Sequence, residues 1–157
     1  MSPSEARTIY EYARIPAPPA RVWRALTDTA EFAAWFQATA DRNFEPSAVV
    51  RMVSTHPSAN GVRFTIAIEE MTPERRFSWR WHPGAQQPPE GSNAPTTLVE
   101  FELRAERGGT MVTVVESGFE AIPAERRVPI YLENENGWKQ ALKALGNYLL
   151  RGPIGNR

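Results

Sequence analysis

The feature that most constrains the fold is a long amphipathic segment near the C-terminus, residues 129–150. Apolar side chains recur there at helical spacing and form one stripe: Trp138, Leu142, Leu145 and Leu149. Pro129 suits the first helical position, where its missing N–H needs no partner, and Gly152 and Pro153 are typical of a helix end. At ~1.5 Å per residue the helix would span ~32 Å. A helix of that length with one apolar face needs a broad apolar partner, and the rest of the chain predicts a sheet.

The composition limits the class of protein. The chain has 157 residues, which predicts a single domain over residues 1–157 with a core at about 8–150. Its 18 basic and 18 acidic residues balance, so nothing global favours nucleic acid or an anionic membrane. The absence of cysteine excludes disulfides and thiol chemistry. Without an apolar leader or a run of ~20 apolar residues, we expect a cytoplasmic protein with no membrane span, as a monomer or homodimer.

The N-terminal part predicts one strand and two short helices. Alternation over residues 8–14 indicates the strand, and a short helix follows a proline run at residues 20–26. Asp28 can cap the second helix, and Glu31 three residues later completes a pattern like a capping box. This second helix carries three aromatic side chains: Phe32, Trp35 and Phe36.

From residue 44 on, the hydrophobic period changes to two. Strands are predicted at residues 49–53, 62–71, 77–81, 97–103 and 110–119, with a short partner for the first of them around Phe44. Asn60-Gly61 and Gly108-Gly109 indicate tight hairpins, and residues 83–95 form a long loop. The sequence therefore predicts an α+β fold, in which a curved antiparallel sheet of about six or seven strands wraps around the terminal helix.

Several local motifs in this order resemble a known family. They are IPAPPARVWRALTD at 15–28, Trp35-Phe36, PERRF at 73–77 leading to Trp79 and Trp81, GGTMVTV at 108–114, SGF at 117–119, and Gly137-Trp138 with Leu142 and Leu145. The chain resembles the START-related helix-grip superfamily, which contains lipid-transfer domains, birch-pollen-allergen-type proteins and polyketide cyclases. It is most similar to the single-domain homologues of the activator of heat-shock-protein ATPase. The resemblance implies a cavity between sheet and helix that takes a small hydrophobic or aromatic molecule.

The predicted cavity combines inward-facing sheet residues with the inner face of the helix. Its expected ligand-binding residues are Trp35, Phe36, Phe64, Ile66, Trp79, Trp81, Phe101, Val112, Val114, Glu116, Tyr131, Asn134 and Trp138. Each aromatic ring has ordinary core packing as its alternative. The long loop at residues 83–95 is either a lid or a plain connection.

Glu116 and Asn134 are the polar candidates for this cavity. Glu116 shares a strand face with Val112 and Val114, where relatives often have histidine, so it can point inward as an acid, base or ligand anchor. Alternatively, the strand twists near Gly118 and the carboxylate reaches solvent or pairs with an arginine. Asn134 lies one turn before Trp138 and can bond Glu116 or a ligand, or simply pack.

Three functions remain open. The first is non-catalytic binding of a small hydrophobic or aromatic ligand, and we expect no cofactor and no metal, because two isolated histidines do not form a metal site. The second is a cyclase, aromatase or dehydratase with Glu116 as base and Asn134 or Tyr131 holding an oxyanion. The third, implied by the resemblance, is binding of a chaperone partner with stimulation of its ATPase.

Overall fold

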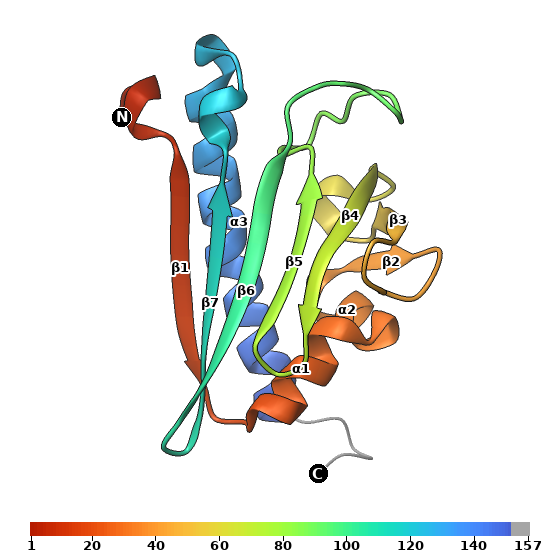
Figure 1. Ribbon diagram of the computed structural model, residues 1–157, viewed down its shortest axis with the longest axis vertical. Coiled ribbons are helices and arrows are strands. Elements are labelled where there is room, and N and C mark those ends of the chain that lie inside the picture. The colour runs from red at the N-terminus through yellow and green to blue at the C-terminus, as the bar shows by residue number, and fades with distance from the viewer. Residues whose placement is uncertain (152–157) are drawn as a thin grey trace.

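The computed structural model describes residues 1–151, in which a seven-stranded antiparallel sheet lies against one long helix (Figure 1). The elements in chain order are β1 (Thr8–Ile15), α1 (Pro19–Thr27), α2 (Thr29–Phe36), β2 (Ala38–Ala40), β3 (Val49–Ser54), β4 (Arg63–Thr72), β5 (Arg76–Trp81), β6 (Thr97–Glu106), β7 (Gly109–Ser117) and α3 (Ala124–Arg151), with 3₁₀ turns at Pro3–Glu5, Pro57–Ala59 and Phe119–Ala121. The strand order is β1-β7-β6-β5-β4-β3-β2. This arrangement confirms the predicted α+β helix-grip fold.

The terminal helix begins earlier than the sequence predicted. It starts at Ala124, so Pro129 lies inside the helix and not at its first position. Pro129 cannot donate to the carbonyl of Glu125, but that carbonyl belongs to the exposed first turn, where water can satisfy it. The 28 residues span ~42 Å and cross the sheet from end to end. The predicted helix end at Gly152 and Pro153 falls outside the described residues.

The two short helices meet at Asp28, and their junction confirms one half of the predicted capping box. The Asp28 carboxylate accepts the backbone N–H of Glu31 at 3.0 Å and caps α2. The reciprocal half was wrong, because the Glu31 carboxylate turns to Arg21 at 2.7 Å, Arg24 at 3.0 Å and the Tyr148 hydroxyl at 2.8 Å. Glu31 therefore ties α1 and α2 to the end of α3.

Two predicted strand details were also wrong. The short strand that pairs with β3 is β2, and Phe44 instead packs its ring edge-on against Phe32 in the core. The last strand ends at Ser117, because Gly118 at φ 102° turns the chain into a 3₁₀ turn that buries Phe119.

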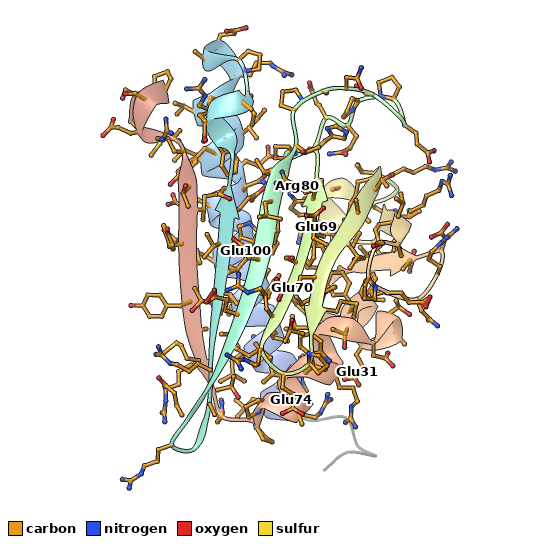
Figure 2. The ribbon with its side chains drawn as sticks, in the orientation of Figure 1. Glu31, Glu69, Glu70, Glu74, Arg80 and Glu100 are labelled. Atoms are coloured by element: carbon orange, nitrogen blue, oxygen red, sulfur yellow. The ribbon has the colours of Figure 1, made fainter. Side chains whose placement is uncertain are left out.

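The core lies between α3 and the inner face of the sheet. The largest fully buried side chain is Trp79 of β5, whose ring lies 5.6 Å from that of Phe101 on β6. The outer face is charged: Figure 2 shows Glu69, Arg80 and Glu100 on the side of the sheet that is turned away from α3. Within residues 1–151, no helix combines the length and the apolar character needed to cross a membrane.

Candidate functional site

Glu116 is fully buried on the inner face of β7. Every second side chain of this strand is buried, which places four residues inward: Thr110, Val112, Val114 and Glu116. The sequence left two orientations open for Glu116, and the structure places it inside, opposite Val99 of β6. Its position follows from the regular alternation of the strand, which continues up to Gly118.

Four side chains donate hydrogen bonds to the Glu116 carboxylate. Oε1 accepts Trp138 Nε1 at 2.7 Å and Asn134 Nδ2 at 3.0 Å. Oε2 accepts Thr97 Oγ1 at 2.5 Å, Trp81 Nε1 at 2.9 Å and Asn134 Nδ2 at 3.1 Å. The sequence predicted the contact with Asn134 as one alternative and missed Thr97. The sequence did contain a signal for Thr97, because it is a polar residue at the start of β6 on the strand face that is otherwise apolar.

The electrostatic character of this cluster is unusual for a buried carboxyl group. All four partners are neutral, and within residues 1–151 Glu116 forms no ion pair with a lysine or arginine. Two indoles and an amide nitrogen can only donate, and an ionised carboxylate can only accept, so the two sets match. Both oxygens are saturated with donors, which offsets the cost of removing the group from water.

A cavity of about 260 Å³ lies beside this cluster. It is bounded by α3, by the start of β4 and the end of β5, and by the chain segments that precede β4 and follow β5. Its wall consists of Phe36, Ser54, Ala59, Val62, Phe64, Trp81, His82, Gly84, Ala85, Gln87, Glu133, Asn134, Gly137, Trp138 and Ala141. The rings of Trp81 and Trp138 are stacked at 5.7 Å and 27°, and Phe64 meets Trp81 edge-on at 5.9 Å. Trp81, Trp138 and Asn134 thus belong both to the wall and to the Glu116 cluster.

The predicted ligand-binding residues divide between this wall and the core behind it. The wall contains Phe36, Phe64, Trp81, Asn134 and Trp138. The core contains Trp35, Ile66, Trp79, Phe101, Val112, Val114, Glu116 and Tyr131. The cavity therefore opens at one end of the sheet–helix interface, because large rings such as Trp79 and Phe101 fill the centre. Gly137 and Ala141, four residues apart on α3, were missed; small residues at helical spacing beside Trp138 were the signal.

The loop at residues 83–95 supplies one side of the wall. Gln87 Nε2 donates to the carbonyls of His82 at 2.9 Å and Gly84 at 2.7 Å, which holds the start of the loop in a tight turn. The Ala85 N–H donates to Glu133 Oε1 on α3 at 3.1 Å and fixes the turn against the helix. Whether the loop opens as a lid stays a prediction.

Comparison with known proteins gives the family. The model of the family described as Activator of Hsp90 ATPase homolog 1-like protein matches residues 16–150. The chain belongs to this family. The predicted resemblance to the helix-grip superfamily is thereby confirmed. No curated protein matches the chain.

Solved structures share the fold at low sequence identity. Protein MLL2253 from Mesorhizobium loti is 26% identical, with a TM-score of 0.73 over 94% of this chain and 100% of that one. DynU16, from the dynemicin biosynthetic locus, is 23% identical with a TM-score of 0.73 over 96% of this chain, which spans only 50% of DynU16. CalU16 from Micromonospora echinospora is 23% identical, with a TM-score of 0.64 over 93% of this chain and 76% of that one. The last two similarities show the fold alone.

Proposed function

We propose that this protein binds a small, largely apolar or aromatic molecule in the cavity between α3 and the sheet, without transforming it. The observation that carries the proposal is the wall itself, in which four aromatic rings from different elements converge on an open space of about 260 Å³: Phe36, Phe64, Trp81 and Trp138. Rings of this kind supply large apolar contact areas at fixed geometry. The volume is slightly below the range typical of drug-sized ligands, so the ligand is small.

The arrangement of Glu116 favours binding over catalysis. A general base must reach the proton that it removes, directly or through one water. Glu116 does not line the cavity, and both of its oxygens already accept hydrogen bonds from Trp81, Thr97, Asn134 and Trp138. A cyclase-type reaction with Glu116 as base would require these bonds to break. This supports the non-catalytic alternative.

A substitution that fills the cavity tests the proposal. Gly137 lies on α3 at the cavity wall, and an added Cβ meets no heavy atom within 4 Å, so Gly137→Leu can occupy the cavity without disturbing the helix. Gly146→Leu is the matched control, because Gly146 lies on the same helix with the same open surroundings but away from the cavity. We expect 2-naphthol to quench the tryptophan fluorescence of the wild type and of Gly146→Leu, and to lose its affinity for Gly137→Leu.

Two outcomes would contradict the proposal. Equal 2-naphthol affinity in Gly137→Leu and the wild type would show that the ligand binds elsewhere. Turnover of a polyketide-like substrate that is lost in Glu116→Gln, while the fold is kept, would support the cyclase alternative. The family description also favours the chaperone alternative. Its direct assay is whether this protein stimulates ATP hydrolysis by purified Hsp90.

A further inference from the structure

The hydrogen-bond donors in the cavity wall point away from the cavity. Trp81 and Trp138 both direct Nε1 to the Glu116 carboxylate, and Asn134 directs Nδ2 to the same group. The N–H edges of the two indole rings are therefore not available to a ligand, which leaves the outer faces and the carbon edges of the stacked pair. The face of an aromatic ring carries negative electrostatic potential. Glu116 thus determines which side of these side chains is available for recognition.

The polar atoms that remain at the wall are mostly acceptors. Within residues 1–151, Asn134 Oδ1, Gln87 Oε1 and Glu133 Oε2 form no hydrogen bond. Asn134 Oδ1 and Gln87 Oε1 are not among the buried atoms without a partner, and Glu133 is an exposed residue. His82 Nδ1 lies 3.1 Å from the Pro95 carbonyl, which places its proton on Nδ1 and leaves Nε2 an acceptor in the neutral ring. The Ser54 hydroxyl accepts the His56 N–H at 3.2 Å, and among the described residues it donates no hydrogen bond, so its proton is available to a ligand.

The charged groups in the cavity wall and directly behind it are both acidic. Glu133 is the charged side chain in the wall, which contains no lysine or arginine. Glu116 lies directly behind the stacked indoles, fully buried and without a cationic partner among the described residues. Charge-assisted bonds from the indole N–H groups to a carboxylate also increase the electron density of the rings. A buried anion without a counter-charge is costly, and a cation in the cavity would offset part of that cost.

We propose that the cavity selects a small organic cation, a protonated amine or quaternary ammonium attached to an apolar or aromatic body. This inference rests on the proposed function and specifies the charge of its ligand. The ammonium group would lie against the outer side of the Trp81–Trp138 stack. Where it is a protonated amine, Glu133 and the Asn134 carbonyl oxygen would also accept its hydrogen bonds. The apolar body would contact Phe36 and Phe64. Cation–π contacts gain strength where water is displaced, as it is in such a cavity.

Three ligands of one shape and different charge test this inference: 2-phenylethylamine, 2-phenylethanol and 3-phenylpropanoate, titrated near pH 7 by tryptophan fluorescence and calorimetry. We expect the amine to bind about tenfold more tightly than the alcohol, which corresponds to about 1.4 kcal/mol, and the carboxylate to bind most weakly. Glu133→Gln should weaken amine binding several-fold and leave the alcohol unchanged. Glu135→Gln, the same charge change on the same helix outside the wall, should change neither.

The outcomes separate this inference from the proposed function. If the alcohol or the carboxylate binds as tightly as the amine, and Gly137→Leu abolishes that binding, the cavity is a ligand site but does not select a cation. The same conclusion follows if Glu133→Gln and Glu135→Gln weaken amine binding equally, because the effect is then one of overall charge. If none of the three ligands nor 2-naphthol binds, both proposals fail.

Discussion

Glu100 and Glu116 lie on neighbouring strands and opposite faces of one sheet, and they are stabilised in different ways. In the ladder between β6 and β7, Val99 is opposite Glu116, and Glu100 is opposite Val115, so the two carboxylates are one rung apart. Glu100 faces outward with 25% of its side chain exposed and accepts Arg76 Nη1 at 2.7 Å. Glu116 faces inward with 0% exposure and accepts neutral donors instead. On the solvent-exposed face the carboxylate pairs with a charged guanidinium, and on the buried face it accepts hydrogen bonds from neutral groups.

The outer cluster remains in contact with water. Arg76 lies 2.7 Å from Glu100, 2.8 Å from Glu102 and 3.8 Å from Glu70, so one guanidinium contacts three carboxylates that water also reaches. When a partner is removed there, water can take its place. Behind the cavity wall no water replaces a lost donor, because the group is enclosed by Trp81, Thr97, Asn134 and Trp138. The same chemical group therefore has small energetic consequences on one face and large ones on the other.

The largest effect is expected for Glu116→Gln. The new amide nitrogen would replace one of the two oxygens, so it would face either the N–H groups of Trp138 and Asn134 or those of Trp81 and Asn134 with the Thr97 hydroxyl. In either orientation buried donors would meet a donor and lose an acceptor. We expect a loss of about 2–4 kcal/mol in the free energy of unfolding, measured by urea denaturation. Glu100→Gln on the other face is the matched control and should lose less than about 1 kcal/mol. Equal losses in the two variants would contradict the comparison.

A smaller effect is expected for Thr97→Val. The two side chains have the same shape, so this change removes the 2.5 Å bond to Glu116 and leaves the packing of β6 nearly intact. Loss of one bond to a charged acceptor predicts about 1.5–3 kcal/mol of destabilisation, measured by urea denaturation. Thr113→Val is the control on the outer face of β7, where the hydroxyl has no side-chain hydrogen bond among the described residues. A Thr97→Val protein as stable as wild type would show that three donors suffice.

The sequence was a good guide to which face each residue occupies. Period-two alternation placed Val112, Val114 and Glu116 on one side of a strand, and helical spacing placed Asn134 and Trp138 on the inner face of α3. These patterns depend only on residues that are close in the sequence, so they predict the orientation of each side chain without knowledge of the tertiary contacts. They suffice for the fold and for the inward orientation of a carboxylate.

The donors and the cavity depend on contacts that no local pattern contains. Trp81 of β5 is paired with Thr97 of β6. A long loop connects these two strands, so the sequence does not predict which residue of one strand is paired with which residue of the other. The cavity was expected between the sheet and the helix with Trp79 and Phe101 in its wall, but these two rings belong to the buried core, and the opening lies at the end next to Gly137. The position of a cavity depends on how side chains of different volume pack in three dimensions. The hydrophobic pattern of the sequence does not contain that information.

The smallest change in the free energy of unfolding is expected for Arg76→Met, in the ion-pair cluster on the outer face of the sheet. The substitution keeps much of the apolar stem and removes the guanidinium that contacts three carboxylates. Exposed ion pairs contribute about 0–1 kcal/mol, and salt at ~1 M screens both the lost attraction and the repulsion left among the carboxylates. The difference in unfolding free energy between Arg76→Met and wild type should therefore shrink in high salt, whereas that between Glu116→Gln and wild type should persist. If the Glu116→Gln difference also disappeared in salt, water and ions would have to reach the inner carboxylate, and the contrast between the two faces would fail.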